Sequence, residues 1–67
     1  MDYVYLVWDN NGLRMICKNE VDATLKVNSI ASNEYGFNLD DTPLDYSGAI
    51  FRYGWIDAAW WTKELIY

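Results

Sequence analysis

The sequence predicts an α+β fold, a small antiparallel sheet with one helix packed on one face, in the order β-β-α-β-β. Two observations near the start predict it. An Asn-Gly turn signal separates two strand-like runs, and a helix-like run with a capping residue follows directly. Strand-like aromatic segments return after residue 48. The length of 67 residues predicts a single domain over 1–67.

Residues 3–8 and 13–18 are rich in β-branched, aromatic and aliphatic side chains, which predicts two strands. The Asn11-Gly12 dipeptide between them predicts a two-residue turn. That turn would set Asp9 opposite Arg14, a favourable charge pair. It would direct one set of side chains toward the helix, namely Val4, Leu6, Trp8, Met15 and Cys17, the last as a buried thiol. The uncovered side would receive Tyr5, Val7, Ile16 and several aromatics near the C-terminus.

A helix is predicted from Glu20 to about Tyr35, because Asn19 is a good N-cap residue. Its polar side chains form a narrow stripe, and the remaining arc is wide and apolar. We therefore expect the helix to lie across the sheet with its flanks covered as well. Gly36 is expected to end the helix in the left-handed conformation, with Phe37 making the apolar contact just beyond.

Residues 38–48 have the composition of a turn-rich loop, and residues 49–55 predict a third strand. Gly54 inside that strand indicates a bulge or a close approach of another backbone. Two structures fit the last segment. We favour a turn followed by a strand from Trp60 to Tyr67, because the residues there prefer extended structure. The alternative is a short helix capped by Asp57.

The composition excludes several classes of function. The chain has no His and a single Cys. It therefore lacks the residue that is the commonest general base and metal ligand, and it cannot form a Ser-His or Cys-His nucleophile pair. We therefore expect no enzymatic activity, no cofactor and no metal. A net charge of −5 argues against binding a nucleic-acid backbone and suits a basic protein partner. The single Cys and the lack of a long apolar run predict a cytoplasmic protein with no membrane association.

An aromatic cluster near the C-terminus is one candidate partner-binding site. Adjacent Trp60 and Trp61 point to opposite sides of a strand, so one can enter the core while the other stays partly exposed. An exposed Trp near an Arg is typical of a protein interface. The alternative is that a small domain uses these rings for its core. The cluster comprises Arg52, Tyr53, Trp55, Trp60 and Trp61.

An acidic loop is the other candidate. It holds Asp40, Asp41 and Asp45, which would steer a basic partner by charge. The order of these residues lacks the alternating oxygen ligands, central Gly and terminal Glu of an EF-hand, so no metal site is predicted. The alternative is an ordinary solvated turn.

Two segments resemble a group of small uncharacterised phage and bacterial proteins. Val4-Tyr5-Leu6-Val7-Trp8 resembles their VYLLW-type first strand, and the residues from Ile56 to Glu64 resemble their closing pattern of Asp followed by Trp-Thr-Glu. The resemblance implies a compact α+β domain without known catalytic residues. It also implies an origin among short accessory genes, many of which encode inhibitors of host or defence proteins.

Together these observations predict a non-enzymatic protein-binding module. It would be a phage-type accessory protein or inhibitor that occludes the surface of a host or defence protein, acting in the host cytoplasm if phage-encoded. Two alternatives remain open. One is a structural homo-oligomer that pairs through its exposed sheet face or C-terminal strand. The other is a small-ligand binder that stacks a nucleotide on an aromatic ring.

Overall fold

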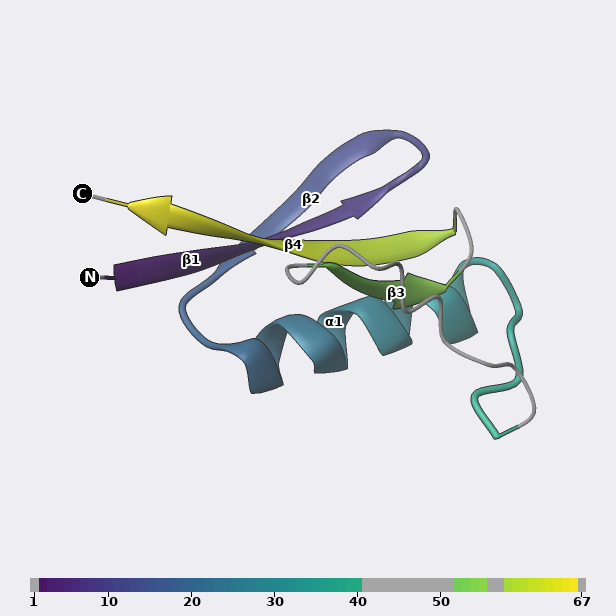
Figure 1. The fold of residues 1–67 in the computed structure, drawn as a ribbon. Helices are drawn as coiled ribbons and strands as arrows, with labels where there is room; N and C mark the ends of the chain where they lie inside the picture. Colours follow the sequence, from purple (N-terminus) through teal and green to yellow (C-terminus); the bar gives the residue numbers. More distant parts are fainter. Residues whose placement is uncertain (1, 41–51, 56–57, 67) are drawn as a thin grey trace.

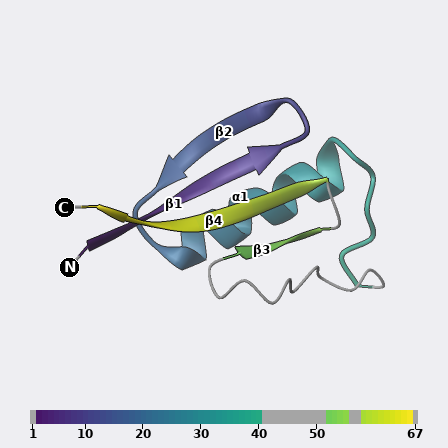
Figure 2. The ribbon, with the colours of Figure 1, turned by 45° about the horizontal axis from the view of Figure 1, so that its top comes forward.

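The computed structural model describes residues 2–40, 52–55 and 58–66, and within them it confirms the predicted β-β-α-β-β order. The elements are β1 (Asp2–Asp9), β2 (Gly12–Cys17), α1 (Glu20–Asn33), β3 (Arg52–Trp55) and β4 (Ala59–Ile66). The strands form one antiparallel sheet in the order β2-β1-β4-β3, and α1 lies against one side of it (Figure 1). The first and last strands are therefore the central pair, and their outer ends lie side by side (Figure 2).

The turn of the first hairpin lies one residue earlier than predicted. The loop is Asn10-Asn11, and Asp9 pairs with Gly12, which has a positive φ of 119°. The Asp9 side chain favours this turn, because its Oδ1 accepts the Asn11 N–H at 2.7 Å. The register then shifts by one residue at Arg14, which has no direct partner on β1. Asp9 and Arg14 still form an ion pair, although they are not opposite each other.

This register reverses the predicted faces of β1. Leu6 pairs with Ile16 instead of Cys17, and Cys17 pairs with Tyr5. A one-residue change of register moves side chains to the opposite face of a strand. Tyr5 and Val7 are therefore buried under the helix, which corrects their predicted place on the uncovered side. The residues that lie on the uncovered face instead are Val4, Leu6 and Trp8.

The helix begins and ends as the sequence predicts. The Asn19 side chain accepts the Asp22 N–H at 2.8 Å, so the N-cap is formed. Gly36 has a φ of 72°, and the Phe37 N–H donates to the Ala31 carbonyl, which turns the chain back toward the core. The flanks of the helix are not covered, however.

Two apolar side chains on those flanks are exposed. Val21 is 68% exposed and Leu25 is 62% exposed, which corrects the expectation that the helix is covered on its flanks. The helix residues that are buried against the sheet form a single stripe. That stripe consists of Ala23, Val27, Ile30 and Ala31, all buried.

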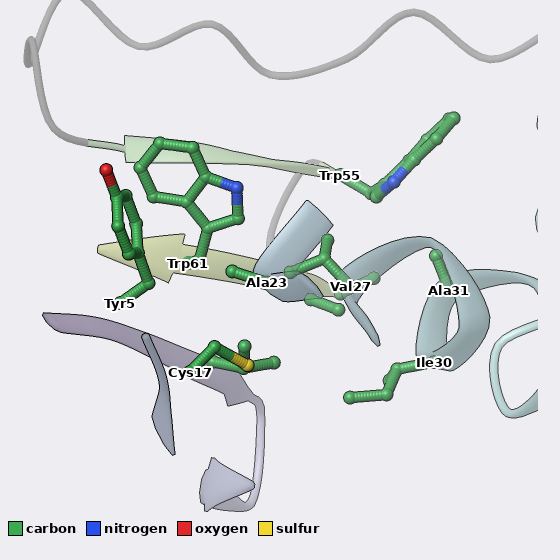
Figure 3. Close-up of a cluster of buried hydrophobic side chains, with 11 residues drawn as sticks. Tyr5, Cys17, Ala23, Val27, Ile30, Ala31, Trp55 and Trp61 are labelled. Carbon is green, nitrogen blue, oxygen red and sulfur yellow. The ribbon is translucent and has the colours of Figure 1, made fainter. Parts of the chain in front are cut away.

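The core lies between this stripe and the sheet (Figure 3). Within it, Trp61 packs against two other rings, with the Tyr5 ring edge-on at 5.1 Å and the Tyr53 ring stacked at 5.8 Å between centroids. The indole N–H of Trp61 donates to Thr24 Oγ1 at 3.0 Å, and that of Trp55 donates to Asn28 Oδ1 at 2.8 Å. Each buried indole thereby connects the sheet to the helix, and its one polar group has a hydrogen-bond partner.

The C-terminal segment forms a strand, which confirms the favoured prediction. β4 runs from Ala59 to Ile66 and pairs with both β1 and β3. Gly54 marks a close approach, as predicted, because a Cβ on it would lie 2.3 Å from the Cβ of Trp60. The predicted start of the third strand at residues 49–51 and the alternative cap Asp57 lie outside the described residues.

Candidate partner-binding surface

No element of the described chain covers the sheet face that points away from α1, and apolar side chains line it. We call this the open face. The central pair of strands contributes Trp8 and Trp60, which stand directly opposite each other in the register and are both half-buried. Around them, Leu13 is 49% exposed and Ile16 is 61% exposed. The open face comprises Val4, Leu6, Trp8, Leu13, Ile16, Arg52 and Trp60.

Trp60 is held in place from two sides. It pairs across the sheet with Gly54, whose missing side chain leaves room for the close approach of the Trp60 backbone and Cβ. The Arg52 guanidinium lies over the indole, with Cζ 5.1 Å from the ring centroid. A cation over an indole face is attracted by the ring quadrupole. The ring is therefore presented in a fixed orientation, which lowers the entropy lost when another molecule packs on it.

Trp8 is fixed by a hydrogen bond within the same face. Its indole N–H donates to Thr62 Oγ1 at 2.9 Å, a residue on the neighbouring strand. Because this polar group already has a partner, the exposed part of the ring can be covered by an apolar surface without leaving an unpaired donor. Trp8 and Trp60 thus form a pre-organised aromatic pair on the open face.

The predicted aromatic site is divided between the two sides of the sheet. Arg52 and Trp60 lie on the open face. Tyr53, Trp55 and Trp61 point to the helix side, where Trp55 and Trp61 are 3% and 5% exposed. The prediction that one of Trp60 and Trp61 enters the core while the other stays partly exposed is confirmed.

The structure describes one of the three predicted acidic residues. Asp40 is exposed, and its N–H donates to Asn38 Oδ1 at 3.0 Å, a hydrogen bond typical of a turn. Asp41 and Asp45 lie outside the described residues. The described part of the loop is therefore a solvated turn that carries negative charge.

Sequence reasoning did not place Leu6, Trp8 and Leu13 on the open face. The alternation along β1 was visible in the sequence, but its phase depends on the register of the hairpin. The available signal was Asp9, whose side chain can bind the N–H two residues later. That bond places the turn one residue earlier in the sequence.

A chain of two ion pairs connects this hairpin to the C-terminal end of the helix. The sequence predicted one of them, Asp9 with Arg14. The Arg14 guanidinium contacts Asp9 and also binds both carboxylate oxygens of Glu34, at 2.9 and 2.8 Å. Burial alone would raise the pKa of Asp9, but hydrogen bonds from Arg14 and the turn N–H groups outweigh it and hold that pKa below its usual value. The hydrogen bonds from Arg14 likewise lower the pKa of Glu34. Both carboxylates are thus charged near neutral pH.

No family model, curated protein or solved structure matches this chain. Within the described ranges, no three acidic or Cys side chains gather in a way that could hold a metal ion. The helix of 14 residues is too short and too polar to cross a bilayer.

Proposed function

We propose that the protein is a non-enzymatic binding module that occludes a surface of a larger protein. The observation that carries this proposal is the open face, where Trp8 and Trp60 are held in fixed orientations with part of each ring exposed. Trp and Arg side chains dominate the energetics of protein interfaces, above all near the centre of the contact. Here Trp60 and Arg52 lie together beside Trp8, with aliphatic side chains around them.

The chemistry of the partner follows from charge. The net charge of −5 favours association with a basic surface and would speed the encounter at low salt. Asp40 and the other two aspartates of the loop, Asp41 and Asp45, would contribute to this steering. The resemblance of the two end segments to small phage proteins supports the more specific proposal of an accessory protein or inhibitor that acts on a host or defence protein.

A homo-oligomer is the second candidate, because Ile16 and Leu13 expose apolar surface at one side of the open face. Two copies could pack these faces together and bury the same side chains. Sedimentation at micromolar concentration separates the two candidates. A monomer leaves the open face available for a different protein, whereas a stable dimer that Ile16→Glu dissociates would favour the second candidate.

The test of the first candidate is capture with matched variants. Tagged wild-type protein, Trp60→Ala and Val21→Ala are used to capture partners from a lysate of the cells in which the protein is made. Val21 is an exposed apolar residue on the helix, so its variant controls for a general loss of surface hydrophobicity. A specific partner should be retained by Val21→Ala and lost by Trp60→Ala, with all three proteins folded by circular dichroism. A partner that binds the Trp60→Ala and Trp8→Ala variants as well as wild type would contradict the proposal.

A further inference from the structure

A second surface, which shares Ile16 with the open face, lies between β2 and the helix. β2 is at the edge of the sheet, so no described strand pairs with its outer side (Figure 2). An edge strand presents N–H and C=O groups to which another strand can bind. The free edge borders an open groove of about 580 Å³. Its lining includes Met15, Cys17, Lys18, Asp22, Leu25 and Lys26.

The groove combines apolar walls with positive charge. Met15 on the strand is 44% exposed and Leu25 on the helix is 62% exposed, so apolar surface faces solvent on both sides. Within the described residues, neither Lys18 nor Lys26 pairs with a carboxylate. The acidic residue of the groove, Asp22, accepts a hydrogen bond from Asn19 Nδ2 at 3.1 Å and so belongs to the helix cap. Two lysines and one aspartate give the lining a net charge of +1, in a protein whose net charge is −5.

We propose that this groove binds an extended segment of a partner protein that directs both apolar and acidic side chains into it. The segment would add to the edge of β2 as a further strand, with its backbone bound to the free N–H and C=O groups. Side chains of a strand alternate between faces, so every second side chain would point into the groove. Within that set, apolar side chains would pack against Met15 and Leu25, and acidic side chains would reach Lys18 and Lys26.

The position of the bulge supports this geometry. The irregularity at Arg14 disturbs the first half of the strand, and such a bulge hinders pairing at an edge. The strand residues from Met15 to Cys17 come after it and line the groove, and Lys18 follows them directly. The regular part of the edge and the apolar groove therefore coincide.

Charge argues against a second copy of this chain as the occupant. Each copy carries a net charge of −5, so two copies repel each other, and β2 has no acidic residue that could bind the lysines of a second groove. An acidic segment has the complementary charge. Most of the groove lies apart from the open face, so this inference does not depend on the proposed role of Trp8 and Trp60.

The test is a selection from a displayed library of random linear dodecapeptides on the immobilised protein, followed by affinity measurement with the enriched peptides. We expect enriched sequences that carry apolar and acidic residues at every second position. The double variant Lys18→Gln/Lys26→Gln should weaken binding about tenfold, because each surface ion pair contributes a factor of roughly two to five. The control Asn10→Asp/Asn33→Asp changes the net charge by the same amount away from the groove and should leave affinity within about twofold.

A second matched pair tests the apolar wall. Leu25→Gln should weaken binding by about five- to tenfold, whereas Val21→Gln, an equally exposed site on the same helix outside the lining, should not. Amide signals of residues 15–18 should shift on peptide binding, and Trp60→Ala should bind the peptide normally. Four results would overturn the inference: no enrichment, enrichment of basic or helix-patterned peptides, affinity that survives the lysine substitutions, or self-association that Leu25→Gln abolishes.

Discussion

At the residue scale, Asp9 shows how one side chain sets the geometry of a hairpin. It accepts the Asn11 N–H, pairs with Arg14, and is 3% exposed. Its folded-state pKa lies below the ordinary value of 3.8, so the ionised form is stabilised by folding. That contribution is present above the ordinary pKa and is lost as the pH falls through the folded-state pKa.

We therefore predict that Asp9→Asn lowers the free energy of unfolding at pH 7 by roughly 1–3 kcal/mol. The variant should also lose less stability than wild type between pH 5 and pH 2, because the group that titrates is gone. Urea unfolding at several pH values measures both effects. Asp2→Asn, at the exposed end of β1, is the matched control and should follow the wild-type profile. Parallel acid profiles for wild type and Asp9→Asn would contradict the assignment.

Cys17 gives a second prediction at this scale. Burial raises the pKa of its thiol, the charge of Asp22 raises it further, and the charge of Lys26 partly offsets this. The thiolate is the reactive form, so Cys17 should resist iodoacetamide in the folded protein at pH 7.5 and react readily in urea. Mass spectrometry of the two samples measures the difference. Rapid modification of the folded protein would show that this strand end opens to solvent.

At the scale of elements, Gly54 allows β3 to lie against β4. A Cβ at this position would lie 2.5 Å from the Ala59 carbonyl oxygen and 2.6 Å from the Trp60 Cα, both backbone atoms that cannot move aside. We predict that Gly54→Ala destabilises the protein by about 3 kcal/mol and removes hydrogen-exchange protection from β3 before α1.

Gly36→Ala is the matched control, because its site has a φ of 72° and open space around the Cβ. It should lower the free energy of unfolding by about 1 kcal/mol, from backbone strain alone, and leave β3 protected from hydrogen exchange. Equal costs at the two positions would mean that the close approach of β3 and β4 is not what requires Gly54.

Elements defined by local signals could be predicted from the sequence, and elements defined by long-range contacts could not. The helix ends followed from Asn19 and Gly36, whose effects act within a few residues. The hairpin register did not, because it depends on the side-chain bonds of Asp9 and on the contact between Arg14 and Glu34, twenty positions apart. The sequence did predict that Trp60 and Trp61 face opposite sides, but which of them enters the core depends on how β4 pairs with β1 and β3.

At the scale of the whole molecule, the topology explains this division. β1 and β4 are neighbours at the centre of the sheet although they lie at opposite ends of the sequence (Figure 1). One side of this pair carries the core under a single helix in the described chain, and the other side is the open face. Trp61 and Trp55 fill the first, whereas Trp60 and Trp8 occupy the second. Adjacent tryptophans thereby have different physical roles.

We predict that Trp61→Ala and Trp60→Ala separate these roles. Trp61→Ala removes the centre of the core and the bond to Thr24, so it should lower the free energy of unfolding by about 3–5 kcal/mol, a large part of the stability of so small a domain. Trp60→Ala removes a half-buried ring and its contact with Arg52. It should lower the free energy of unfolding by about 1–2 kcal/mol and stay folded. Chemical unfolding followed by far-ultraviolet circular dichroism gives both values without relying on indole fluorescence. If the two substitutions destabilise the fold equally, Trp60 is a structural residue like its neighbour, and the open face loses the anchor on which the binding proposal depends.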